Sequence, residues 1–297
     1  MSNNKKIILY LDGGAMSGVF CAGVLTTFQD LNIYPHIEAV YAASAGAFNA
    51  PYFLTRQSRL GSSIYWENLT KDFILPWNLP LGILQRIFNK RIPKDRIKNV
   101  IDVDYLLKIA KSVKPLDTEK IGQIPFYVKV LDVKTSQDKY ILADSCNIFD
   151  LLRASICVAP YTFESTLINK EYYIDGTIRE PIGLRYLLDK YSDKRIVIVS
   201  NRRGNSKFRH KIKSFLEGIM AWLMYGKGFY KMFMERDKLA DDDISLAKNN
   251  KNVLLIHAPD DCPVRPSTIN EKKLKIAYEM GKKAGLRIKD LINIDRF

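Results

Sequence analysis

The chain has 297 residues, and its 47% hydrophobic and 26% charged residues exclude an intrinsically disordered protein. Its four cysteines are scattered, without a CxxC pair or a neighbouring histidine, which argues against a disulfide framework and a zinc site and fits a reducing compartment. The formal net charge of +14 favours a polyanionic partner, either nucleic acid or anionic lipid headgroups, unless it forms only a solvated basic face.

The N-terminal segment lacks the features of a targeting signal. Only the apolar run from Ile7 to Leu11 precedes Asp12, whereas a secretory signal needs a longer apolar stretch and a small-residue cleavage site. No run of about eighteen apolar residues occurs, so the sequence predicts no transmembrane helix. We expect a cytoplasmic protein, with peripheral attachment to a membrane left open.

The predicted elements alternate between strands and helices, which indicates an α/β fold with a largely parallel sheet covered on both faces. Short β-rich runs predict the strands, and apolar residues at helical spacing predict the helices. The predicted strands cover residues 6–11, 38–43, 125–133, 139–142, 172–174, 195–200 and 253–257. The predicted helices cover residues 17–31, a stretch beginning at 45, and residues 149–155, 181–190 and 271–286.

Two aromatic and apolar segments, residues 73–88 and 215–233, fit this alternation poorly. The second segment directly follows a basic run, and a helix with basic and apolar faces can lie in a membrane interface. Each cation near an anionic bilayer contributes about 1 kcal/mol, so we expect a preference for anionic interfaces. The alternative is that both segments lie in the core or cover the active site. The cations concerned are Arg202, Arg203, Lys207, Arg209, Lys211 and Lys213.

The first of three candidate motifs is DGGAMSG at residues 12–18, between a predicted strand and a predicted helix. Glycines there let the backbone turn sharply and aim N–H groups at a position that suits negative charge. That position can hold a phosphate or the oxyanion of an acyl transfer reaction. The spacing matches neither GxxxxGK[ST] nor GxGxxG, so the motif alone decides little.

The second motif is VYAASAGA at residues 40–47, in which Ser44 lies between a strand and a helix of small residues. This is the arrangement of a nucleophile elbow, where a tight turn exposes the serine hydroxyl. The other interpretation is a serine that caps the helix N-terminus.

The third motif is Asp175-Gly176 at a predicted strand end, which by itself also fits an ordinary turn. The chain has three histidines, and His257 alone follows both the serine and the acid at a strand end. An α/β-hydrolase needs a serine, an acid and a histidine in that order, so a triad would depend on His257.

Together the three motifs resemble, in order and spacing, the signatures of patatin-like phospholipases, which use a Ser–Asp dyad without histidine. The matching stretches are DGG at 12–14 with Gly18, SAG at 44–46, DG at 175–176, the approach to the aspartate at 152–182, and a tail at 263–281 that is similar to a bacterial subgroup. The resemblance covers nearly the whole chain.

The resemblance implies that Ser44 is the nucleophile and that Asp175 takes its proton directly. The N–H groups of Gly13, Gly14 and Ala15 would form the oxyanion hole. A phospholipid or another lipid ester would be cleaved through an acyl-enzyme, without a metal or cofactor. The implied fold is a three-layer α/β/α sandwich over residues 1–297, with a motif-bearing core at about 6–200 and a helical completion at about 201–297.

The chain departs from the family pattern at several positions. Ala15 replaces a third glycine, Ser17 an arginine, Ala42 the first elbow glycine, and Thr177 a Gly or Ala. Pro51 also lies within the predicted helix after the elbow, where proline favours a bend. None of these changes removes the nucleophile or the base, so we expect a working enzyme with reduced preference for phosphate.

Two other classes of function remain alternatives. One is a weak or inactive patatin relative that binds acyl chains or anionic membranes, which the departures and the charge favour. The other is a nucleic-acid-binding protein, which the charge alone favours. Because no nucleic-acid motif occurs, we expect no nucleic-acid partner.

Overall fold

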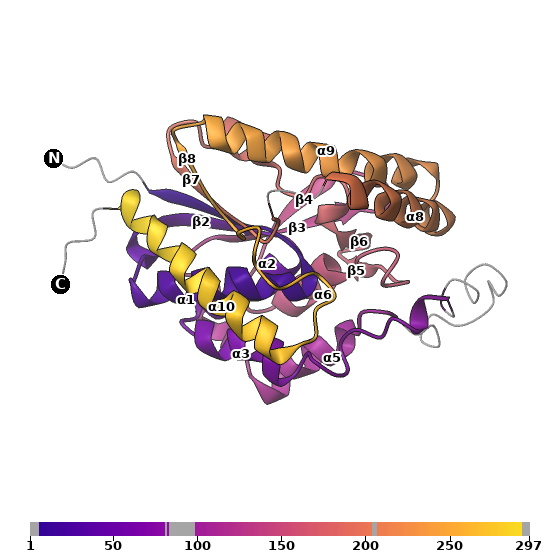
Figure 1. Cartoon of the computed structure of the whole chain (residues 1–297), viewed down its shortest axis with the longest axis horizontal. Coiled ribbons are helices and arrows are strands. Elements are labelled where there is room, and N and C mark those ends of the chain that lie inside the picture. Colours follow the sequence, from indigo (N-terminus) through magenta and orange to yellow (C-terminus); the bar gives the residue numbers. More distant parts are fainter. Residues whose placement is uncertain (1–5, 81, 83–98, 204–206, 293–297) are drawn as a thin grey trace.

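The structure is a computed structural model that describes residues 6–80, 82, 99–203 and 207–292, without the side chains of 207–213 (Figure 1). Within these ranges one eight-stranded sheet has the order β5-β6-β3-β2-β1-β7-β8, with β4 paired to β3. Five neighbouring strands of the sheet run parallel, namely β3, β2, β1, β7 and β8. The strands β4, β5 and β6 form antiparallel pairs. The strands are β1 (Ile7–Leu11), β2 (Ile37–Ala42), β3 (Phe126–Asp132), β4 (Asp138–Leu142), β5 (Thr166–Ile168), β6 (Glu171–Asp175), β7 (Arg195–Ser200) and β8 (Val253–His257).

Helices cover both faces of this sheet, which confirms the predicted three-layer α/β/α fold (Figure 1). In β1, Leu9 and Leu11 face the layer that contains α1, α2 and α10, whereas Ile8 and Tyr10 face α7 and α9. All four side chains are buried, as expected for a parallel strand covered on both sides. The helices are α1 (Gly18–Asp30), α2 (Ala45–Leu54), α3 (Ser58–Glu67), α5 (Val103–Lys108), α6 (Ile148–Ile156), α7 (Leu184–Lys190), α8 (Lys207–Tyr225), α9 (Lys227–Asn249) and α10 (Glu271–Gly285).

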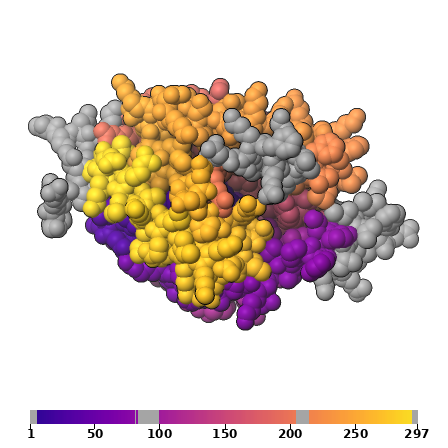
Figure 2. Space-filling view, in the orientation of Figure 1, coloured from indigo at the N-terminus to yellow at the C-terminus, as the bar shows by residue number. Residues whose placement is uncertain are grey.

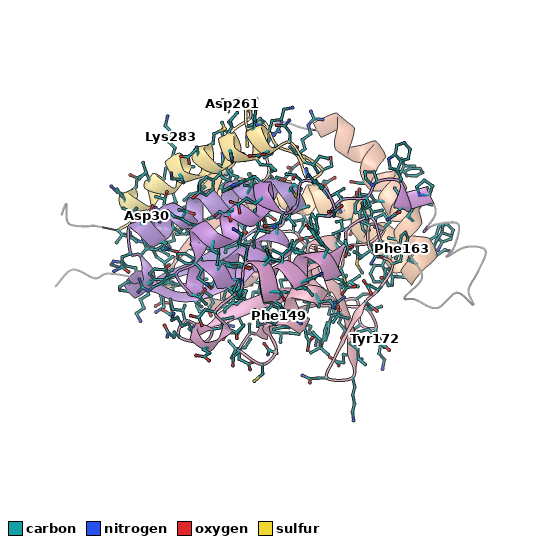
Figure 3. All side chains as sticks on the ribbon, turned by 90° about the horizontal axis from the view of Figure 1, so that it is seen from below. Asp30, Phe149, Phe163, Tyr172, Asp261 and Lys283 are labelled. Carbon is teal, nitrogen blue, oxygen red and sulfur yellow. The ribbon has the colours of Figure 1, made fainter. Side chains whose placement is uncertain are left out.

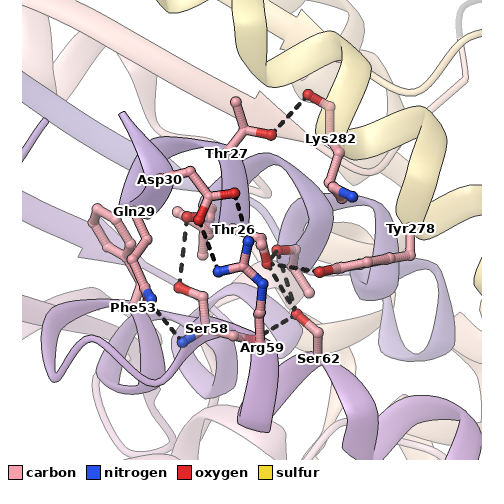
Figure 4. A network of polar contacts seen from close by, with 12 residues as sticks. Thr26, Thr27, Gln29, Asp30, Phe53, Ser58, Arg59, Ser62, Tyr278 and Lys282 are labelled. Atoms are coloured by element: carbon pink, nitrogen blue, oxygen red, sulfur yellow. Dashed lines mark hydrogen bonds and ion pairs between the residues drawn. The ribbon is translucent and has the colours of Figure 1, made fainter. Parts of the chain in front are cut away.

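Helix α10 packs closely on α1, so elements from the two ends of the sequence lie side by side (Figure 1). A Cβ on Gly23 would lie 2.1 Å from a backbone oxygen of α10, and a Cβ on Gly281 would lie 2.1 Å from one of α1. Only glycine permits such an approach. Thr27 Oγ1 also donates to the carbonyl of Lys282 at 2.8 Å, within a polar network that includes α3 (Figure 4).

The structure corrects the start of one predicted helix and shows the form of one segment that the sequence left open. The helix predicted from residue 181 begins at Leu184, because Gly183 adopts a left-handed φ of 77° and the buried Asp243 accepts hydrogen bonds from the N–H groups of both residues. The aromatic run 215–233, which fitted the predicted alternation poorly, spans the junction of α8 and α9, which is broken at Gly226 with φ 100°. In contrast, α2 continues through Pro51 to Leu54.

The expected apolar segment at residues 73–88 lies partly outside the described residues. Within the described ranges, no helix combines the length and the apolar character needed to cross a membrane.

Candidate active site

Ser44 occupies a strained turn between β2 and α2. Its φ of 52° and ψ of −125° lie outside the regions that residues with a side chain normally adopt, at a cost of about 1–3 kcal/mol. Ser44 stands at the N-cap position of α2, but its side chain makes no capping hydrogen bond, which argues against a purely capping serine. The turn is held by Ser155, whose Oγ accepts from Ser44 N at 2.8 Å and donates to Lys129 O at 3.1 Å.

Asp175 ends β6 and is fully buried. Its Oδ1 accepts hydrogen bonds from Thr177 N at 2.8 Å and from Thr177 Oγ1 at 2.7 Å. Its Oδ2 makes no hydrogen bond within the described part of the chain. Burial raises the pKa of Asp175 to about 6, while the bonds from Thr177, the nearby Ser44 side chain and the positive charge of Arg236 lower it. The carboxylate is therefore fixed through one oxygen, and the other can take a proton.

Gly13, in the loop after β1, lies beside Ser44 and beside Thr177 of the Asp175 turn. A Cβ on Gly13 would lie 2.9 Å from Ser44 Cβ and 3.0 Å from Thr177 Cγ2, so the position has room only for glycine. The structure thus brings the glycine loop, Ser44 and the Asp175 turn together, as the resemblance to patatin-like phospholipases implies.

The carbonyl groups of the glycine loop all have partners that turn them in defined directions. Asn201 Nδ2 donates to Asp12 O at 2.9 Å and to Gly13 O at 3.0 Å, and Ser17 Oγ donates to Gly14 O at 2.7 Å. In a trans peptide the N–H points opposite to the C=O, so the following amides are turned away from these donors.

The three amides of this loop differ in their partners. Gly14 and Ala15, with φ of 143° and 46°, donate no hydrogen bond within the residues that the structure describes. The N–H of Gly13 lies near enough to the Asp12 carboxylate to lower the pKa of that group. The N–H groups of Gly14 and Ala15 are therefore free to donate to a bound group, whereas that of Gly13 interacts with the Asp12 carboxylate.

Asp12 anchors the loop through a buried polar contact. Burial raises its pKa, and Arg202 followed by Ser200 opposes the shift. Ser200 Oγ donates to Asp12 Oδ2 at 2.8 Å, and Arg202 Nε lies 3.5 Å from the same oxygen. Arg202 also lies 3.7 Å from Asp237 of α9. The guanidinium therefore links the glycine loop to the α8–α9 hairpin.

This contact changes the interpretation of the basic run. Arg202 pairs with Asp12, and Arg203 donates to the carbonyl of Val264, so both cations are engaged within the fold. The structure does not describe the side chains of the other four cations of this run, which belong to residues 207–213.

The residues that sequence reasoning missed are supporting residues. Asn201 directly follows β7, which neighbours β1, and the carboxyl ends of parallel strands meet at one edge of a sheet. Its position could therefore have been recognised. Ser155 and Arg236 come from helices distant in the chain and carry no local signal.

His257 lies away from this cluster. It ends β8, and β7 and β1 separate that strand from β2, which places it about 14 Å from the strand of Ser44 at ordinary strand spacing. Its Nδ1 lies 3.0 Å from the carbonyl of the adjacent Ala258. This arrangement does not support a triad. Among the described residues, no group of three or more His, Cys, Asp or Glu side chains is arranged to hold a metal ion.

Comparison with known proteins identifies related sequences and structures. The model of the family described as patatin-like phospholipase matches residues 9–188. The uncharacterized protein YjjU of Escherichia coli (strain K12) is 25% identical over 186 residues, which cover 61% of this chain and 48% of YjjU. This chain thus spans about half the length of that relative.

Among solved structures, VipD from Legionella pneumophila has a TM-score of 0.50 and 16% identity, over 97% of this chain and 67% of VipD. The type III effector protein ExoU of Pseudomonas aeruginosa has a TM-score of 0.44 and 10% identity, over 97% of this chain and 53% of ExoU. At this identity, the likeness to VipD establishes the fold alone.

Proposed function

The chain belongs to the patatin-like phospholipase family, whose model matches residues 9–188 of its 297, and we propose that it is a serine acyl hydrolase that cleaves lipid carboxylic esters. The observation that carries this proposal is a strained Ser44 beside the turn of a buried Asp175, whose Oδ2 has no hydrogen-bond partner in the described chain. A serine on a strained turn beside a carboxylate that can accept a proton is an arrangement suited to nucleophilic catalysis by a serine with a general base.

In the proposed reaction Ser44 Oγ attacks the ester carbonyl carbon, and its proton passes to Asp175 Oδ2. The N–H groups of Gly14 and Ala15 stabilise the oxyanion, and one such donor contributes about 3 kcal/mol. The leaving alcohol takes the proton from Asp175, which leaves an acyl ester on Ser44. A water molecule then gives a proton to Asp175 while its oxygen bonds to the acyl carbon. The bond between that carbon and Ser44 Oγ breaks, Oγ takes the proton back from Asp175, and the carboxylic acid departs.

The departures from the family pattern are compatible with this chemistry. Ala15 adopts its left-handed conformation despite its methyl group, and Ser17 holds the carbonyl of Gly14. Ala42 is buried without disturbing the elbow, and Thr177 supplies both hydrogen bonds to Asp175. These contacts favour a working enzyme over an inactive relative.

The proposed partner is a phospholipid or another lipid ester, with no nucleic acid and no cofactor. We also infer that residues 1–297 form one acyl hydrolase domain, because β7 and β8 extend the sheet and α10 packs on α1.

Labelling with a fluorophosphonate probe tests the proposal. We expect one modified residue, Ser44, when the labelled protein is digested and mapped by mass spectrometry. Ser62→Ala is the matched control, because Ser62 is also a buried serine but lies on α3. Labelling that persists in Ser44→Ala, or that disappears in a folded Ser62→Ala protein, would contradict the assignment.

A further inference from the structure

Helix α8 has an inverted distribution of polar and apolar side chains. Among its described residues the buried ones are small or polar, namely Ser214, Glu217, Gly218 and Ala221. The exposed ones are large and apolar, with 45% to 54% of their surface exposed, namely Phe215, Leu216, Trp222 and Leu223. A surface helix of a globular protein normally buries its large apolar side chains and exposes its polar ones.

The buried face of α8 is held by specific contacts. Glu217 accepts from Arg236 Nη2 at 2.8 Å and also from the hydroxyl of Tyr161. Ser214 Oγ donates to Asp237 at 2.7 Å. If α8 rotated to bury its apolar side chains, it would lose these bonds and separate the Glu217 carboxylate from Arg236 and Tyr161. The apolar face is therefore fixed outward.

The exposed apolar residues also form one continuous stripe along the helix. Phe215, Leu216, Trp222 and Leu223 are spaced by one, seven and eight positions, which places them on the same side of an α-helix. Together they define what we call the α8 face. Large exposed apolar patches of this kind mark sites of contact with a partner or a membrane.

The α8 face lies close to the candidate active site. Ala221, on the inner side of α8, belongs to the same buried cluster as Ile174, the residue before Asp175. Tyr225 of α8 also donates to the carbonyl of Glu164, next to Phe163, which lies at the α8–α9 end of the molecule (Figure 3). The inner side of α8 therefore belongs to the same packed cluster as the end of the strand that carries Asp175, and the α8 face lies on the opposite, outer side of the helix.

We propose that the α8 face docks on an anionic lipid bilayer, from which the ester substrate reaches Ser44; this inference rests on the proposed function. The face is apolar and contains Trp222, a residue suited to a bilayer interface. The first two turns of α8 add cations in sequence, and Lys227 at the start of α9 is exposed. These cations are Lys207, Arg209, Lys211 and Lys213. Among the described side chains, the exposed Lys227 follows Trp222 and Leu223 by about one turn, and its positive charge complements anionic headgroups. A cation beside an apolar face favours an anionic bilayer over a neutral protein partner.

Vesicle binding by the Ser44→Ala protein tests the surface, with phosphatidylcholine vesicles alone or with about one-third phosphatidylserine. We expect Leu216→Gln/Leu223→Gln to lower binding to the anionic vesicles by about tenfold or more. The matched control is Ile276→Gln/Leu286→Gln, since these residues are 53% and 47% exposed but lie on and just after α10, on another part of the surface (Figure 2). The control should bind as the parent does.

Fluorescence locates the contact directly. The chain has three tryptophans, so Trp66→Phe/Trp77→Phe leaves Trp222 as the reporter. We expect its emission to shift to the blue on anionic vesicles and to be quenched by brominated acyl chains. Unchanged emission on vesicles that bind the protein would overturn the proposal, because another surface would then make the contact.

Activity measurements on protein with Ser44 intact distinguish a failure of the docking surface from a failure of the proposed function. Leu216→Gln/Leu223→Gln should hydrolyse a water-soluble p-nitrophenyl ester at the parent rate and hydrolyse vesicle phospholipid more slowly. A parent without activity on either ester would refute the function and leave the binding result standing. The docking surface would be overturned if both double variants lost vesicle binding to the same extent. It would also be overturned if neither variant lost vesicle binding. A dimer that only the α8 variant dissociates would instead assign the face to a second copy of the chain.

Discussion

Arg236 on α9 and Glu217 on α8 form a largely buried ion pair, with 2.8 Å between Nη2 and Oε2. The pair joins the two helices of the hairpin beside the turn that carries Asp175, because Phe233, one helical turn before Arg236, packs with Ile174 and Ile178. Burial is the main influence that raises the pKa of Asp175, and the charge of Arg236 is among those that oppose it. A residue far from the family motifs therefore adjusts the candidate base.

This relationship predicts a change in pH dependence. Asp175 must be ionised to accept the Ser44 proton, so kcat/KM on a p-nitrophenyl ester should rise with pH through about 6. Arg236→Gln removes a charge that lowers the pKa of Asp175, so the rise should move to higher pH. Lys238→Gln removes an exposed cation from the same helix and should leave the profile in place. An unmoved profile in Arg236→Gln would show that the two groups are not coupled.

A second prediction separates the dyad from a triad. Asp175→Asn should lose nearly all activity, by about 10³-fold or more, because an amide cannot accept the serine proton. His257→Ala should keep most activity, since β7 and β1 lie between its strand and that of Ser44. Steady-state hydrolysis of a soluble ester measures both. An inactive His257→Ala with an active Asp175→Asn would reverse the assignment.

The same carboxyl group should make stability depend on pH. In the folded protein its pKa is about 6 instead of 3.8, so between these values the folded state binds more protons than the unfolded state. Its contribution to the free energy of unfolding therefore falls as pH rises from about 4 to 6, by roughly 3 kcal/mol. Asp175→Asn lacks this titration, so its stability relative to the parent should be higher at pH 8 than at pH 4. Urea unfolding at both pH values measures the difference, and an equal difference at both would contradict the raised pKa.

The local parts of the fold were predictable from the sequence, and the contacts between distant elements were not. The strand before Ser44 and the helix after it follow from periodicity and small residues, so the elbow could be placed. The start of α7 was missed because Asp243, some sixty residues away, caps it. The pairing of Arg202 with Asp12 was missed because charge counting treats every cation as free. Such pairings depend on which strands become neighbours in the sheet.

A fourth prediction concerns the space between nucleophile and base. Gly13→Ala would place a methyl group 2.9 Å from Ser44 Cβ, so the loop or the serine must move. A displacement of about 1 Å near reacting groups lowers the rate by about 10²-fold, and we expect a loss of that order in kcat. Gly228→Ala is the matched control, because its new methyl group meets nothing within 4 Å on α9. The control should keep full activity and gain about 0.5–1 kcal/mol of stability, since alanine suits a helix better than glycine. Full activity in Gly13→Ala would remove this loop from the site.

The last prediction assigns a positioning role to Asn201. Its Nδ2 holds the carbonyls of Asp12 and Gly13, and its Oδ1 accepts from Cys21 N at 3.0 Å, so one side chain ties the glycine loop to α1. Asn201→Ala would free both peptide groups to rotate, and the amide of Gly14 would lose its fixed direction. Because fixed donors stabilise the transition state more than the bound ester, kcat should fall by about 10- to 100-fold while KM stays near the parent value.

Thr26→Val is the control for Asn201, because it also deletes a buried polar group, on α1, without touching the loop. The control should leave kcat unchanged even where it lowers the melting temperature. If Asn201 merely stabilised the fold, both variants would lose stability and neither would lose kcat at a temperature where both are folded. A fall in kcat confined to Asn201→Ala would instead tie the direction of the loop carbonyls to the chemical step.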